Sequence, residues 1–236
     1  MPLTLVLIHS PLVGPFTWEP AAEVLRSRGI DARVPELANP VAGPFWERHV
    51  HSAVDGLGAI EPDAPVVLAG HSGAGVLLPA IARELSRPVA AYLYVDAGLP
   101  RPGQPRMEGR FGELLRQLYE EGERFPNWTG DDLAGILPDA SVRARVLAEL
   151  RPQPFAFWQE PLPEVEGWPD APGGYLLFSP AYEDDAAAAE RLGWPVRRMS
   201  AGHFHMLVGP DAVVEAMQDL LDELGIRADG HDPAGA

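Results

Sequence analysis

A glycine-rich turn directly behind an apolar run constrains this chain more than any other feature. Residues 65–68 read Pro-Val-Val-Leu, and residues 69–75 read Ala-Gly-His-Ser-Gly-Ala-Gly, with Ser72 at their centre. A serine between small residues fits a tight strand-to-helix turn, whose strained backbone would exclude bulky neighbours. The segment predicts a buried strand that leads into a helix and makes Ser72 a candidate nucleophile. The alternative is a glycine-rich turn without a catalytic role.

Short apolar runs alternate with helical patterns along most of the 236 residues. Such runs are typical of buried parallel strands. We predict strands over residues 3–8, 31–37, 66–69, 89–95, 174–179 and 196–199. We predict helices over residues 18–28, 45–60, 76–85, 184–192 and 211–224. The alternation indicates an α/β fold with a doubly wound, mostly parallel sheet and a ligand site at the carboxyl ends of its strands.

Residues 99–172 break this rhythm, because their helical segments are interrupted by proline and glycine. We expect a helical lid here, inserted into a core of residues 1–98 and 173–226, with a flexible tail at residues 227–236. Seven phenylalanine and tryptophan residues are scattered through the lid: Phe111, Phe125, Trp128, Phe155, Phe157, Trp158 and Trp168. We expect at least two of them to line an apolar pocket over Ser72. The alternative is that they only hold the lid together.

Composition excludes several classes of function. The formal net charge of −16 leaves no basic surface for nucleic acid or an anionic membrane. The absence of cysteine excludes disulfides, thiolate metal sites and a cysteine nucleophile, and it is compatible with the cytoplasmic location that we expect. The apolar N-terminal run has no basic region or cleavage site and is too short to span a bilayer, so we expect a buried strand there. We expect no metal and no cofactor.

A serine nucleophile needs a base, and the base must be held by a third group. His203 is the best candidate, because it follows the last predicted strand and stands next to Gly202. His205 is the competitor, since alternate residues of an extended stretch face the same side and it could line the pocket or form a structural hydrogen bond. His9 is expected to brace the loop after the first strand.

The chain resembles enzymes of the α/β-hydrolase fold over residues 3–224. The motifs that carry the resemblance are His9-Ser10-Pro11-Leu12 followed by Trp18, Gly70-His71-Ser72-Gly73-Ala74, and Gly202-His203 ahead of Pro210. Residues 92–100 and the helical insertion are similar to small esterases of the plant salicylate-esterase and hydroxynitrile-lyase type. The resemblance implies a serine, acid and histidine triad in that chain order, and an oxyanion hole built in part by the Gly73 N–H.

The position of the acid departs from the family pattern. Most members carry it at a point that falls near Ala181 or Tyr182, and neither residue is acidic. Asp96 ends the strand that follows the helix predicted over residues 76–85, a site that some members use instead, so we expect Asp96 to orient His203. Glu183 or Asp184 could be recruited by a small loop shift, and a chain without a triad acid is the third reading. A capping role at the start of the lid is the alternative for Asp96.

Pro11 is the second departure. It occupies the place whose backbone N–H normally forms half of the oxyanion hole, and proline has no such hydrogen. Losing one donor costs hydrolases about 2.7–4 kcal/mol of transition-state stabilisation. We therefore expect either that the Leu12 N–H substitutes as donor, or that the reaction does not need a complete hole.

Together these features predict a serine hydrolase that acts on a small apolar ester, thioester or related carbonyl compound through an acyl-enzyme. Catalysis would use Ser72, His203 and Asp96, and Gly73, Leu12, Pro11 and His205 would contact the substrate. A lyase, cyclase or acyltransferase of secondary metabolism with the same fold is the first alternative, supported by Pro11. A non-enzymatic small-molecule receptor is the second, supported by the missing acid at the usual place. The sequence leaves the oligomeric state open.

Overall fold

The computed structural model describes residues 3–61, 64–85, 87–101 and 109–227. Within these residues the chain forms a six-stranded sheet in the order β2-β1-β3-β4-β5-β6, and every neighbouring pair is parallel. The strands are β1 (Thr4–Ile8), β2 (Asp31–Arg33), β3 (Val66–Ser72), β4 (Val89–Ala97), β5 (Gly173–Leu177) and β6 (Val196–Arg198). β3 and β4 lie at the centre, where both faces are covered.

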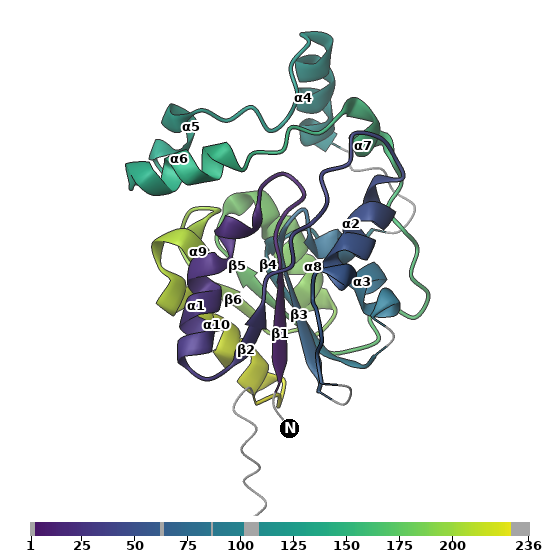
Figure 1. Ribbon diagram of the computed structural model, residues 1–236, viewed down its shortest axis with the longest axis vertical. Helices are drawn as coiled ribbons and strands as arrows, with labels where there is room; N and C mark the ends of the chain where they lie inside the picture. The colour runs from purple at the N-terminus through teal and green to yellow at the C-terminus, as the bar shows by residue number, and fades with distance from the viewer. Residues whose placement is uncertain (1–2, 62–63, 86, 102–108, 228–236) are drawn as a thin grey trace, which may run out of the picture.

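Helices cover both faces of the sheet (Figure 1). One face carries α1 (Glu19–Ser27), the short α9 (His205–Val208) and α10 (Pro210–Glu223), and the other carries α2 (Phe45–Asp55), α3 (Leu78–Glu84) and α8 (Glu183–Arg191). Successive side chains of a strand point to opposite faces. Leu5 and Leu7 accordingly belong to one apolar cluster, and Val6 and Ile8 to the other. The predicted doubly wound α/β architecture is confirmed.

Three predicted boundaries were wrong by several residues. The strand expected over residues 31–37 ends at Arg33, because β2 is an edge strand and Pro35 has no N–H to extend the ladder. The helix expected to reach residue 60 ends at Asp55 with Gly56 as its C-cap, and the left-handed φ of 65° at Gly58 prevents the helix from continuing towards residue 60. The strand that carries the turn extends to Ser72 itself.

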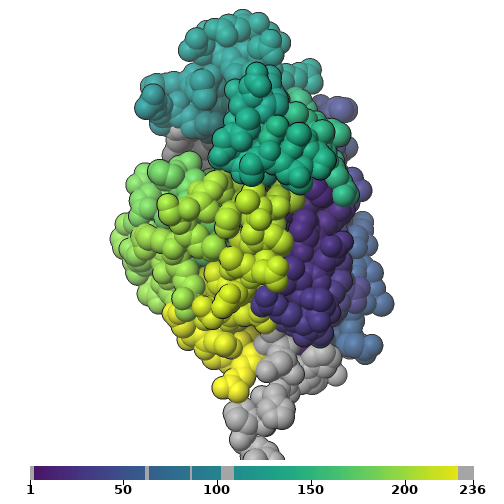
Figure 2. Space-filling model, turned by 90° about the vertical axis from the view of Figure 1, so that its left-hand side faces the viewer, coloured from purple at the N-terminus to yellow at the C-terminus, as the bar shows by residue number. Residues whose placement is uncertain are grey.

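Residues 99–172, called the lid region below, place four helices between β4 and β5 within their described part. These helices are α4 (Gly109–Glu120), α5 (Gly130–Ala134), α6 (Ala140–Ala148) and α7 (Phe155–Gln159). Figures 1 and 2 show them, in teal and green, on the end of the molecule towards which the parallel strands run. Two lid side chains bind core carbonyls: Arg151 Nη1 donates to Leu37 O at 2.6 Å, and Gln153 Nε2 donates to Pro11 O at 2.9 Å. The lid region is thereby anchored beside the loop that follows β1. The tail predicted from residue 227 onward lies, apart from Arg227, outside the described residues.

Candidate active site

Ser72 lies at the carboxyl end of β3 in a strained turn. Its φ is 57°, which is costly for any residue with a Cβ, and its side chain is nearly buried. The turn also needs a small residue behind the serine, since a Cβ on Gly75 would lie 2.3 Å from Gly98 O. The backbone N–H of Gly98 in turn donates to Ser72 O at 3.2 Å. The packing of this turn against β4 therefore fixes the unusual backbone of Ser72.

Asp96 lies at the carboxyl end of the neighbouring strand β4 and is completely buried. Its Oδ2 is 2.6 Å from His203 Nδ1 and accepts a hydrogen bond from the Ser179 hydroxyl. Its Oδ1 accepts hydrogen bonds from the N–H groups of Phe178 and Ser179. Burial opposes ionisation, but the hydrogen bonds from His203 and Ser179 hold the pKa of Asp96 below its usual value. The carboxylate thus stays charged and can orient the His203 ring.

His203 is positioned from its other side by His71. The His71 ring lies with its centroid 4.5 Å from that of His203, and its Nε2–H donates to the His203 carbonyl at 2.9 Å. Burial, with His203 as a nearby positive charge, lowers the pKa of His71 to about 3. His71 is therefore neutral at physiological pH. A neutral His71 places no positive charge beside the His203 ring.

The competing candidates lie elsewhere. Glu183 forms an exposed ion pair with Arg198 at 3.0 Å, and Asp184 is exposed at the start of α8. His205 begins α9 and packs edge-on against the Phe178 ring, with ring centroids 5.7 Å apart. The structure brings Asp96, and neither Glu183 nor Asp184, to the His203 ring.

Tyr182 is a site residue that the sequence reasoning passed over. Its hydroxyl lies 3.1 Å from Ser72 Oγ within hydrogen-bond distance, and its ring stacks on His203 with centroids 5.5 Å apart and planes inclined by 12°. Burial raises the pKa of Tyr182 to about 12. The signal was available, because Tyr182 stands where most family members carry an acid. From the sequence, this position indicated only that the usual carboxylate is missing.

The loop after β1 lies beside Gly73. The Leu12 N–H, expected to face the substrate, donates to Ser10 Oγ at 3.3 Å. Ser10 Oγ in turn lies 3.3 Å from the position that a Cβ on Gly73 would occupy. Pro11 lines the cavity described below but offers no N–H. The group next to Gly73 is thus the Ser10 hydroxyl.

His9 connects this loop to the chain beyond β2. Its Nδ1–H donates to Ser10 O at 2.9 Å, and its Nε2 accepts the Leu37 N–H at 3.0 Å. Because Nε2 accepts, the ring must be neutral. Burial lowers the pKa of His9 to about 4. The neutral ring braces the loop at Ser10.

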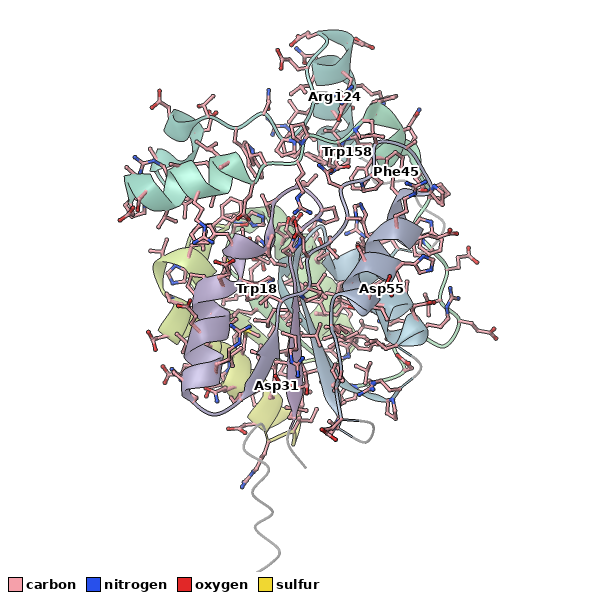
Figure 3. The ribbon with its side chains drawn as sticks, viewed as in Figure 1. Trp18, Asp31, Phe45, Asp55, Arg124 and Trp158 are labelled. Atoms are coloured by element: carbon pink, nitrogen blue, oxygen red, sulfur yellow. The ribbon has the colours of Figure 1, made fainter. Side chains whose placement is uncertain are left out.

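A cavity of about 780 Å³ opens over Ser72 and His203. Five aromatic residues of the lid region line it: Phe111, Phe125, Trp128, Phe157 and Trp158. Several of these rings pack edge to face, for example Phe125 and Trp128 with centroids 5.5 Å apart. Figure 3 shows Trp158 close to Phe45 of α2, in the same apolar cluster. The walls are therefore apolar and fixed against the core.

The two remaining residues of the seven, Phe155 and Trp168, do not line the cavity. Phe155 packs on Tyr119 with ring centroids 5.1 Å apart, and Trp168 packs edge-on against Trp194 at 6.0 Å. A charged pair stands in the otherwise apolar wall, where Arg101 Nη2 lies 3.2 Å from Asp185 Oδ1. Among the described residues no group of three or more histidine or carboxylate side chains is arranged to hold a metal ion.

The comparison with protein families decides the classification. The model of the alpha/beta hydrolase family matches residues 5–216. The chain belongs to this family. Its predicted membership of the α/β-hydrolase superfamily is confirmed, and members of the family act on small molecules. None of the curated proteins matches the chain.

Solved structures with the same fold include several enzymes. An extracellular alpha/beta-hydrolase from a Paenibacillus species, described as homologous to tobacco salicylic acid binding protein 2, is 20% identical with a TM-score of 0.74, over 93% of this chain and 99% of that chain. Tomato methylketone synthase I in complex with 2-tridecanone is 13% identical with a TM-score of 0.72, over 95% and 99%. Polyneuridine aldehyde esterase is 17% identical with a TM-score of 0.68, over 94% and 99%. At these levels of sequence identity, the structural similarity shows that this chain and these proteins share a fold.

Within the described part of this α/β hydrolase, no helix is both long enough and apolar enough to cross a membrane.

Acidification should destabilise the protein through His9. Since folding lowers the pKa of His9 from 6.5 to about 4, the unfolded chain binds a proton in that interval that the folded chain refuses. The free energy of unfolding should therefore fall as the pH falls from 6.5 to 4, with a contribution from His9 of up to about 1.4 kcal/mol per pH unit. Urea titrations at several pH values would measure this slope. His9→Asn retains a donor for Ser10 O and should reduce the slope by that amount, whereas equal slopes for the two proteins would contradict the prediction.

Proposed function

We propose that this protein is a serine hydrolase that cleaves a small apolar ester, thioester or related carbonyl compound through an acyl-enzyme on Ser72. One observation carries the proposal: the 2.6 Å contact between His203 Nδ1 and Asp96 lies at an apolar cavity that also contains Ser72. A nucleophile at the end of β3, an orienting carboxylate near the end of β4 and a base on the loop after β6 are the parts that acyl transfer needs. The buried aromatic walls favour an apolar acyl or alcohol group.

In the proposed reaction, Ser72 Oγ attacks the carbonyl carbon and its proton passes to His203 Nε2. Asp96, held ionised by its hydrogen bonds, stabilises the imidazolium that forms. The bond to the leaving group then breaks, and His203 gives the proton to the departing atom. In the second half, water attacks the acyl-enzyme and gives its proton to His203; the bond from the acyl carbon to Ser72 Oγ then breaks, His203 returns the proton to Ser72, and the acid leaves. The Ser72 hydroxyl must first leave Tyr182 for His203, a rearrangement that substrate binding often completes.

The oxyanion would be bound by the Gly73 N–H and, we propose, by the Ser10 hydroxyl. Ser10 Oγ already accepts the Leu12 N–H, so its own hydrogen is free to point elsewhere. It lies beside Gly73, on the β1 side of the nucleophile. The hydroxyl would thus replace the N–H that Pro11 lacks. Direct donation by Leu12, as expected from the sequence, is the competing prediction.

Ser10→Ala separates these two donors. If the hydroxyl binds the oxyanion, its removal should lower kcat by about 10²- to 10³-fold. If the Leu12 N–H donates directly, the same change frees that N–H and the rate should hold or rise. Ser10→Thr is the matched control, because it keeps a hydroxyl, and it should retain most of the activity. Steady-state rates on one aryl ester measure all three proteins.

Labelling with a fluorophosphonate, together with hydrolysis of p-nitrophenyl butyrate, tests the proposed function. A hydrolase should be labelled at Ser72, as intact mass and peptide mapping would show, and should release nitrophenolate. Labelling without turnover would favour a lyase, cyclase or acyltransferase, the alternative that the absence of an N–H at Pro11 supports. The absence of labelling would favour a receptor. A cytoplasmic location, the absence of a cofactor and a role in secondary metabolism stay predictions.

A further inference from the structure

Tyr182 occupies an unusual place in this site. It ends the turn Pro180–Tyr182 after β5, and the carboxyl end of that strand is where most family members carry the triad acid. Here the His203 Nδ1 position is taken by Asp96 from β4. The phenol instead lies on the pocket side of the base, with its ring against His203 and its hydroxyl 3.1 Å from Ser72 Oγ. Tyr182 therefore touches the reacting atom itself.

The sheet order shows which side of the reaction Tyr182 faces. β1 borders β3 on one side, and β4, β5 and β6 follow on the other. Ser10 and Gly73, the proposed oxyanion donors, lie on the β1 side. His203 and Tyr182 approach from the β5 and β6 side. In a tetrahedral intermediate on Ser72 the oxyanion points to the first side, so the leaving group departs towards the second, where His203 protonates it.

We propose that Tyr182 is a catalytic residue whose hydroxyl donates a hydrogen bond to the leaving-group atom while its bond to the acyl carbon breaks. The proposal rests on the acyl-enzyme function proposed above. His203 supplies the proton that the departing oxygen or sulfur takes up, and the carbonyl re-forms with the electron pair of the oxyanion. Tyr182 keeps its own proton throughout. The high pKa of Tyr182, about 12 through burial, keeps the phenol neutral and able to donate at pH 7 to 8.

A comparison of two esters of one acid tests this role. p-Nitrophenoxide leaves readily without help, whereas ethoxide needs stabilisation as charge develops. Tyr182→Phe keeps the ring that stacks on His203 and removes only the hydroxyl. We expect kcat/KM for ethyl butyrate to fall on the order of 10- to 100-fold, as for loss of one hydrogen bond to a charged group. kcat/KM for p-nitrophenyl butyrate should change by less than about threefold.

Two controls accompany this measurement. Tyr119→Phe removes a tyrosine hydroxyl in the lid region, away from Ser72, that donates to Gln153 O and accepts the Trp158 N–H. The ratio of the two rate constants should stay at the wild-type value in this variant. Labelling of Ser72 by a phosphonate with a p-nitrophenoxide leaving group should proceed at nearly the wild-type rate in Tyr182→Phe. That result would show that the fold and the nucleophile are intact.

The outcomes separate the two proposals. Equal losses on both esters in Tyr182→Phe would make Tyr182 a support for His203 and overturn the leaving-group role. Unchanged or higher rates on both esters would show that Tyr182 contacts Ser72 only in the free enzyme, and would also overturn the leaving-group role. A wild-type protein that is neither labelled nor active on either ester would overturn the hydrolase function, and the role of Tyr182 with it.

Discussion

Ser72→Ala should abolish turnover, with a loss on the order of 10⁴-fold or more in kcat, because no other group can form the acyl-enzyme. The purified variant should also resist phosphonate labelling. Its fold should persist, since a side chain at a strand end contributes little to the core. Steady-state kinetics, intact mass after labelling, and thermal melting measure the three effects. An unchanged rate would show that Ser72 is not the nucleophile.

His203→Ala should match this loss, and the double variant should be little worse than either, since a nucleophile and its base act as one unit. His205→Ala is the matched control, because its ring packs on Phe178 and lies outside the residues that line the cavity. It should cost far less. If His205→Ala were the more damaging change, the base would have been assigned to the wrong histidine.

Asp96→Asn should lower kcat by about 10⁴-fold, the loss seen when the acid of a serine-protease triad becomes an amide. An amide NH₂ facing His203 Nδ1 favours the tautomer that carries its proton on Nε2, where the base must accept. The variant should still fold, because the amide oxygen at the Oδ1 position can keep the hydrogen bonds from the N–H groups of Phe178 and Ser179. The ester assay and thermal melting together separate lost catalysis from lost structure.

Glu183→Gln and Asp184→Asn are the controls for this assignment. Both side chains lie on the surface, and Glu183 pairs with Arg198. Exposed ion pairs contribute about 0–1 kcal/mol to stability, so neither change should unfold the protein. Because neither side chain contacts His203, both variants should keep nearly full activity. The reverse ranking of the three variants would move the role of the acid from Asp96 to the start of α8.

Much of the fold could be predicted from local patterns. Alternation of apolar runs and helical segments indicated the parallel sheet, and the small residues around Ser72 indicated the strained turn. Element boundaries were less accurate. β2 ends at Arg33 because it is an edge strand and Pro35 follows, and the position of a strand at the sheet edge depends on its neighbours as well as on the local sequence. The sequence shows how many aromatic residues the lid region holds, but not which of them line the cavity. Only their packing separates the five that line the cavity from Phe155 and Trp168.

The sequence by itself determined the candidate nucleophile, the candidate base and the type of fold, because each depends on residues that are adjacent or regularly spaced. Only the tertiary structure decided which carboxylate meets His203, since Asp96 and His203 are 107 positions apart and are joined by the order of β4, β5 and β6. The same holds for Tyr182 beside Ser72 and for the Ser10 hydroxyl beside Gly73. These contacts depend on how parallel strand ends converge, and no local pattern encodes a distance between separate strands.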